Sequence, residues 1–117
     1  LQIWVIPATR GLEPTYDPRP VDRERAREEW VPLASGAPGA DGIPRAQGVR
    51  LQVTRLQGNG PRPLELEPDR RAWIHGARGA TTLSGSPLAE GDGVAVSQET
   101  GFVFEGGDAE LLAFDLA

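Results

Sequence analysis

Turn-forming sequences divide the chain from residue 49 onward into short segments. Within these segments apolar and polar residues alternate, as at Val49, Leu51 and Val53, and again at Leu64 and Glu65. Such alternation is typical of strands with one buried face, and short strands between regular glycine turns indicate a β-sandwich or a jelly-roll barrel. A closed barrel also removes exposed strand edges, which would otherwise pair with other chains. The pattern therefore predicts an all-β fold.

The glycine positions predict where the strands and turns lie. No helical periodicity of useful length follows residue 30, so the apolar segments are interpreted as strands. We expect turns at Arg78-Gly79, Gly85-Ser86, Gly91-Asp92-Gly93, Glu99-Thr100-Gly101 and Gly106-Gly107-Asp108. The strands are expected at residues 30–34, 49–54, 64–67, 72–77, 80–84, 87–89, 94–97, 102–105 and 110–116.

The N-terminal part of the chain has a different character. Several prolines break both helix and strand, so residues 7–20 are expected to form a loop. Residues 22–29 are mostly charged and lack an apolar stripe, which predicts a short surface helix capped by Asp22. The length fits a single domain spanning residues 1–117. We divide that domain into an arm, residues 1–20, and a barrel, residues 21–117.

The first six residues are apolar on both faces of a potential strand. Leu1, Ile3 and Val5 lie on one face, and Trp4 and Ile6 lie on the other. A strand of this kind needs cover on both sides. Two interpretations follow: an ordinary buried strand, or an arm that crosses to a neighbouring domain. In the second interpretation the inter-domain contact contains Leu1, Ile3, Trp4 and Ile6.

Composition excludes several classes of function. The formal net charge is −5, with 17 acidic and 12 basic residues, which argues against binding to a phosphate backbone and gives no support to binding of anionic membranes. No cysteine is present for a disulfide or a thiolate, and no lysine for a Schiff base. We expect no nucleic-acid partner and no membrane partner. Methionine is also absent, so we expect a fragment of a longer protein. The bias toward Arg, Ala, Gly and Pro indicates a bacterial source, and the opening segment is too short for a membrane span and lacks the basic start of a signal peptide, so we expect a cytoplasmic protein.

Few residues are candidates for catalysis or metal binding. The chain has one histidine, His75, which we interpret as a surface or hydrogen-bonded structural residue. Glu65 and Glu67 share one side of a strand and could bind a hard cation, but we favour a solvated face, because burying two unpaired carboxylates together is costly. No serine is spaced with an acid and His75 in a way that suggests a catalytic triad. We therefore predict no catalytic residue, no metal site and no cofactor in this chain.

Several segments in order resemble those of pirin-like bicupins. The opening residues 1–7 are similar to the segment that joins the two cupin domains, and residues 71–79 are similar to a strand and turn of the second domain. Residues 91–96 and 110–116 also match. The resemblance is weakest at residues 35–63. It implies a C-terminal cupin domain: a cupin-type double-stranded β-helix, or jelly-roll barrel, with a short surface helix near residues 22–29.

The resemblance also locates the positions at which cupins hold a metal. A cupin cage usually takes three histidines and one glutamate from two motifs, and such ligands suit iron, nickel, manganese or copper. With Gly79 as the turn glycine of the first motif, the glutamate position falls at Ala72. The paired histidine positions then fall near Glu65 and Glu67, or near Leu66 and Pro68 at a different spacing.

The second motif is equally without ligands. Gly93 and Gly101 place its histidine position at Phe104 and its asparagine position at Asp108. Alanine has no lone pair to offer, and a phenylalanine occupies the volume of the metal. The vacant ligand positions are therefore Glu65, Glu67, Ala72 and Phe104.

The function that the resemblance implies belongs to another domain, the expected N-terminal cupin of the same protein. In pirin-like proteins the metal cage belongs to that domain; several bacterial members are similar to quercetin 2,3-dioxygenases, and animal pirin is an iron-binding transcription cofactor. We expect this chain to support a metal-binding N-terminal cupin that holds a divalent transition metal. By itself, the chain is expected to dimerise or to swap its N-terminal arm.

Two other functions stay open. The chain could bind a small ligand, or act as a metal-dependent oxygenase, through its own barrel interior. Glu65, Glu67 and His75 would then be its chemical groups. A β-sandwich module that binds carbohydrate or mediates adhesion fits the strands, but not the resemblance at the two ends of the chain.

Overall fold

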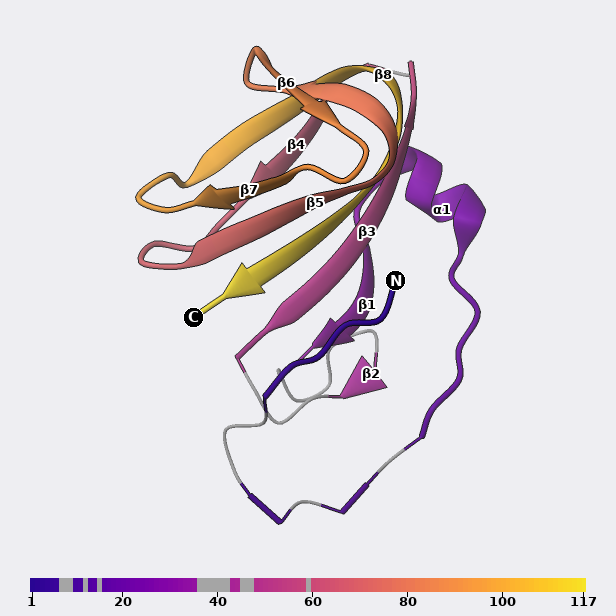
Figure 1. The fold of residues 1–117 in the computed structure, drawn as a ribbon, viewed down its shortest axis with the longest axis vertical. Helices are drawn as coiled ribbons and strands as arrows, with labels where there is room; N and C mark the ends of the chain where they lie inside the picture. The colour runs from indigo at the N-terminus through magenta and orange to yellow at the C-terminus, as the bar shows by residue number, and fades with distance from the viewer. Residues whose placement is uncertain (7–9, 12, 15, 36–42, 45–47, 59) are drawn as a thin grey trace.

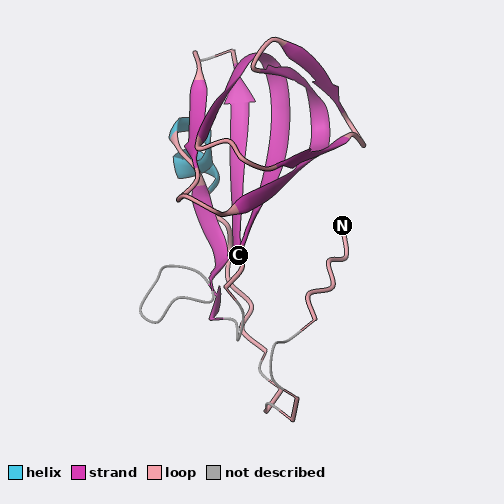
Figure 2. Ribbon diagram, turned by 90° about the vertical axis from the view of Figure 1, so that its left-hand side faces the viewer, coloured by secondary structure: helices cyan, strands magenta, loops and turns pink. Residues whose placement is uncertain are grey.

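The computed structural model describes residues 1–6, 10–11, 13–14, 16–35, 43–44, 48–58 and 60–117. The described part is mostly β-structure, with one short helix (Figures 1 and 2). In chain order the elements are α1 (Arg23–Glu28), β1 (Val31–Ser35), β2 (Ile43–Pro44), β3 (Arg50–Gln57), β4 (Arg62–Glu65), β5 (Arg71–Leu83), β6 (Ser86–Ala89), β7 (Gly93–Val96) and β8 (Gly101–Leu116). The helix is too short to cross a membrane.

Two long strands organise the barrel. β5 and β8 pair antiparallel along most of their length, from Arg71 opposite Leu116 to Leu83 opposite Phe104. The first half of β5 also pairs with β7 and the second half with β6, while β8 pairs with β4 near its start and with β3 near its end. β1 and β2 extend the sheet beyond β3. The two bent strands thus run through both halves of a jelly roll, and the predicted all-β cupin-type barrel is confirmed (Figure 1).

Two predicted turns are wrong, because both lie inside continuous strands. Gly79 is within β5 and Gly107 is within β8, and both have positive φ angles, +68° and +74°. A Cβ on Gly79 would lie 1.9 Å from the carbonyl oxygen of Asp108, and a Cβ on Gly107 would lie 2.1 Å from that of Ala80. The glycines therefore allow the paired strands to bend together without separating.

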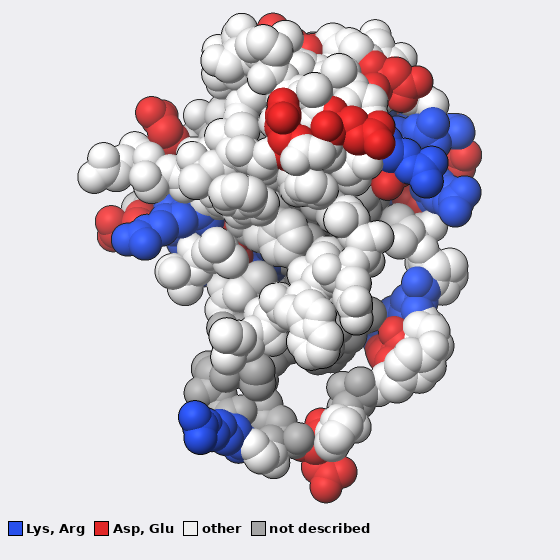
Figure 3. Space-filling view, in the orientation of Figure 1, with Lys and Arg blue, Asp and Glu red and all other residues white. Residues whose placement is uncertain are grey.

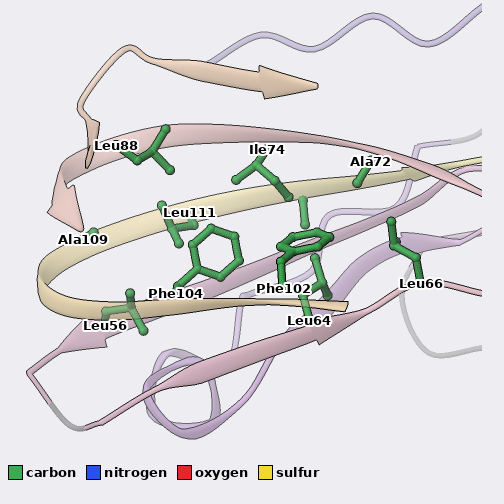
Figure 4. Packing of buried hydrophobic residues seen from close by; sticks show 11 residues of the cluster. Leu56, Leu64, Leu66, Ala72, Ile74, Leu88, Phe102, Phe104, Ala109 and Leu111 are labelled. Atoms are coloured by element: carbon green, nitrogen blue, oxygen red, sulfur yellow. The ribbon is translucent and has the colours of Figure 1, made fainter. Parts of the chain in front are cut away.

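The barrel interior is filled by apolar side chains. Along β8, Leu111 and Ala113 face the interior, whereas Leu112 packs in a second cluster on the outer face. This alternation follows from the period of two in a strand. The inner cluster contains Leu56, Leu64, Leu66, Ala72, Ile74, Leu88, Phe102, Phe104, Ala109, Leu111 and Ala113 (Figure 4).

The helix lies outside the barrel, where it packs on β3 (Figure 2). Asp22 caps it, since its carboxylate accepts a hydrogen bond of 3.0 Å from the backbone N–H of Arg25. Ala26 is its buried residue, Arg27 is half-buried, and the other charged residues of the helix are exposed. The surface helix predicted at residues 22–29 is therefore confirmed.

The first six residues do not form a strand. Leu1, Trp4 and Ile6 are 84–85% exposed. The interpretation of this segment as an ordinary buried strand is therefore wrong. Apolar residues on both faces of the segment indicated that it needs cover on two sides. A strand also needs the edge of a neighbouring strand to pair with, and local sequence does not show whether one is present.

Candidate functional site

Two of the positions at which the resemblance places the metal ligands of a cupin carry apolar side chains. Ala72 on β5 and Phe104 on β8 are both buried, and both point into the barrel (Figure 4). The Phe104 ring meets the rings of Trp30 and Phe102 edge to face, with centroids 5.6 and 5.8 Å apart. These contacts are those of a packed core, and neither side chain has an atom that can coordinate a metal.

The two carboxylate positions lie on the outside of the barrel. Leu64 and Leu66 are buried, so Glu65 and Glu67 between and after them point to solvent. The Arg50 guanidinium donates a hydrogen bond of 2.8 Å to Glu67, and this bond lowers the pKa of the Glu67 carboxyl. At the other spacing of the motif, Leu66 is the interior residue, and it too has no ligand atom.

His75 lies away from these positions. It sits on β5 between buried Ile74 and buried Gly76, half-buried, opposite Leu112 of β8. Within the described ranges, no group of three or more His, Cys, Asp or Glu side chains is arranged to hold a metal ion. The residues present at the cupin metal position therefore do not fit a metal, because the inward-facing ones have no donor atoms and the donors face outward.

An ionic cluster at one end of the barrel was not foreseen. Asp115 is 3% exposed and accepts a hydrogen bond of 2.5 Å from Nε of Arg70. Arg70 also donates to the carbonyl oxygen of Gly48 at 2.6 Å, and Nη1 of Arg50 lies 3.8 Å from Asp115. The cluster joins β3, β8 and the residues before β5. Its only signal in the sequence is an acid in the apolar run that ends β8.

The outer face of the sheet is apolar and hollowed. A groove of about 520 Å³ has a floor that includes Val53 and Leu112, and its rim carries Arg23, Arg55 and Arg78. A second groove of about 240 Å³ is lined by Ile3, Trp4, Val5, Ala34, Val49 and Leu51. Residues 3–5 therefore lie over this face, across the groove from Ala34 of β1 and Leu51 of β3. Figure 3 shows the surface around them as largely uncharged.

Comparisons with known proteins give one family. The family model described as the quercetinase C-terminal cupin domain matches residues 25–116. The crystal structure of YhhW from Escherichia coli matches with a TM-score of 0.85 and 25% identity, covering 97% of this chain and 48% of that one. The bacterial pirin YhhW in complex with nickel(II), also from Escherichia coli, matches with a TM-score of 0.82 and 24% identity over the same shares. No curated protein sequence matches the chain.

The family match and the structural match agree. The family model covers the chain from α1 to the end of β8, and the structural match extends over nearly all of it. The chain spans about half the length of YhhW. It is a pirin-like cupin and belongs to the quercetinase C-terminal cupin domain family.

Proposed function

We propose that this domain is the half of a two-cupin, pirin-like protein that holds no metal, and that it supports a metal-binding N-terminal cupin. The observation that carries the proposal is the packed barrel interior. Phe104 is in edge-to-face contact with Trp30 and Phe102, and the family resemblance assigns its position to a ligand of the cupin cage. A side chain in that place contributes to stability and excludes coordination.

The outer face supports the second part of the proposal. Leu1, Trp4 and Ile6 are exposed apolar side chains, and Ile3, Trp4 and Val5 line a groove together with residues of β1 and β3. Exposed apolar patches of this kind mark interaction sites. The occupant we propose is the N-terminal cupin, because YhhW is about twice as long as this chain.

The parent protein is proposed to use a divalent transition metal in its N-terminal cupin and to resemble a cytoplasmic quercetin 2,3-dioxygenase. The nickel(II) complex of YhhW supports the metal, and the description of the family supports the reaction class. The role of the present domain is to hold the N-terminal cupin in place through its own outer face. None of its described residues is proposed to touch the substrate.

The alternative, a ligand or metal site inside this barrel, has little room. The apolar side chains that face inward form one cluster, and the buried polar residues on the same strands are already paired: Thr54 with Arg62, and Asp115 with Arg70. Glu65 and Glu67, which that alternative would use, are exposed on the outer surface. Among the described residues, no group of side chains is arranged to hold the metal that an oxygenase would need.

Binding between the two halves tests the proposal. The N-terminal cupin and the 117-residue chain are produced as separate polypeptides, and their affinity is measured by calorimetry. Trp4→Ser is expected to weaken binding about tenfold or more, because exposed tryptophans at interface centres contribute most of the affinity. Trp73→Ser, which removes another exposed tryptophan, is the matched control and is expected to leave affinity within about twofold. No binding, or an equal effect of both changes, contradicts the proposal.

A further inference from the structure

The edge strands of the barrel are not equally protected against pairing with other chains. In the part of the chain that the structure describes, β2, β4, β6 and β7 each pair with a single neighbouring strand. Three of them contain a proline: Pro44 in β2, Pro63 in β4 and Pro87 in β6. Proline and charged residues are the usual devices that keep edge strands from pairing. β7, with the sequence Gly-Val-Ala-Val, has neither.

The hydrogen-bond pattern shows which residues of β7 are free to pair. The N–H of Gly76 donates to the carbonyl oxygen of Asp92 at 3.0 Å, and the carbonyl oxygen of Gly76 accepts from the N–H of Gly91 at 2.8 Å, so the backbone groups of Gly76 face the β7 side of β5. The direction of the backbone groups alternates along a strand, so those of Ile74 and Ala72 also face β7. The register therefore directs the backbone groups of Val94 and Val96 toward β5, and those of Gly93 and Ala95 away from it.

The outward edge is accessible and flanked by an aromatic ring. Gly93 and Ala95 are both exposed, and exposure of a glycine is exposure of its backbone. Trp73, opposite Ala95 on β5, is 43% exposed. Its ring lies against Gly93, where a Cβ would come within 2.2 Å of Cζ2. Beside it lies a groove of about 530 Å³ that Ser97 and other residues line.

We propose that β7 is a self-association edge, which pairs antiparallel with β7 of a second copy across a two-fold axis. Such an axis through Val94 sets Gly93 of one copy opposite Ala95 of the other, and each such pair exchanges both of its backbone hydrogen bonds. A second copy is the favoured occupant because the four residues of β7 are small and uncharged, and the axis sets Asp92 of each copy opposite Val96 of the other, so that no like charges face each other across it. The inference does not depend on an N-terminal cupin.

Association through this edge is expected to be weak. The surface area that two four-residue strands bury on pairing is well below the roughly 1,200 Å² that stable complexes bury. Each copy also has a formal net charge of −5, which opposes approach. We expect a dissociation constant on the order of 0.1–1 mM at low ionic strength. Salt should strengthen the dimer several-fold, because it screens the repulsion between copies.

Sedimentation velocity and amide hydrogen exchange on the unmodified 117-residue chain test the proposal. Between about 10 μM and about 1 mM protein, the weight-average mass should rise toward that of a dimer. The exchange rates of the Gly93 and Ala95 amides should fall by at least about threefold over the same range. A strict monomer throughout, or a dimer in which these two amides exchange at unchanged rates, overturns the proposal.

Matched substitutions locate the contact. Ala95→Lys places a charge on the free edge and is expected to abolish association. Ala89→Lys makes the same change at an exposed alanine on β6, whose edge already contains Pro87, and should leave association unchanged. Association that survives Ala95→Lys but is lost in Trp4→Ser assigns the contact to residues 1–6 and contradicts the proposal. If the circular dichroism spectrum shows that Ala95→Lys changes the fold, the variant does not test the contact. The hydrogen-exchange measurement on the unmodified chain then tests whether β7 is the associating edge.

Discussion

A buried guanidinium joins the helix to the barrel. Arg62 is 6% exposed, and it donates to the carbonyl oxygen of Arg27 at 2.7 Å and to the hydroxyl of Thr54. Thr54 in turn donates to the carbonyl oxygen of Ala26 at 3.1 Å. A cation near the last carbonyls of a helix is favourable. Burial lowers the pKa of Arg62, although Glu29 and Glu28 oppose that shift.

Removal of this guanidinium is expected to destabilise the protein. Arg62→Met leaves the Arg27 carbonyl and the Thr54 hydroxyl without their donor, and should lower the free energy of unfolding by about 2–3 kcal/mol. Urea denaturation followed by circular dichroism measures the loss. Arg71→Met, at an exposed arginine, is the control and should change the value by no more than about 0.5 kcal/mol. An equal loss of unfolding free energy in both variants would show that the buried hydrogen bonds of Arg62 add no more stability than an exposed arginine does.

The Glu67 carboxylate makes a pH-dependent contribution. Its hydrogen bond with Arg50 lowers its pKa below the ordinary 4.5, so its stabilising effect is complete above that pH and is lost as the pH falls through the lowered value. Glu67→Gln should therefore be slightly less stable than the parent at pH 7, and the difference should vanish in more acidic solution. Denaturation midpoints across this range test this, with Glu65→Gln as the control. A difference that grows on acidification has the wrong sign for this account.

At the scale of elements, sequence predicted the strands better than their connections. The alternation at residues 49–54 and 64–67 corresponds to β3 and β4. The glycines at 79 and 107 were interpreted as turns, although Gly79 lies in β5 between two register shifts and Gly107 lies in a register shift of β8. A glycine with positive φ serves a turn and a bulge equally well. What distinguishes them is the partner strand, which is distant in the sequence and therefore invisible to a local pattern.

Two neighbouring glycines test the bend in β8. Gly106 and Gly107 both have positive φ, but a Cβ on Gly106 would meet nothing within 4 Å, whereas one on Gly107 would lie 2.1 Å from a backbone oxygen. Gly106→Ala should cost about 1–2 kcal/mol, from the backbone conformation alone. Gly107→Ala should cost about 3–5 kcal/mol, because the strands must also separate. Thermal and urea unfolding compare them, and similar costs would refute the close approach of β5 and β8.

At the scale of the whole molecule, the lack of a three-histidine cage was predictable from the single histidine in the chain. The family resemblance placed two vacant positions at Ala72 and Phe104, and both prove to be interior core residues. The ionic cluster around Asp115 and the burial of Arg62 were not predictable. Both depend on residues brought together by strand pairing, and local patterns treat isolated charges as surface residues.

The central claim is that this barrel has a packed interior that does not coordinate a metal, and titration of the 117-residue chain with nickel(II) tests it most directly. Calorimetry should detect no stoichiometric binding tighter than about 10 μM, and any weaker binding should disappear in His75→Ala, which removes the only imidazole. One equivalent of nickel bound tightly, and still bound in His75→Ala, would contradict the claim.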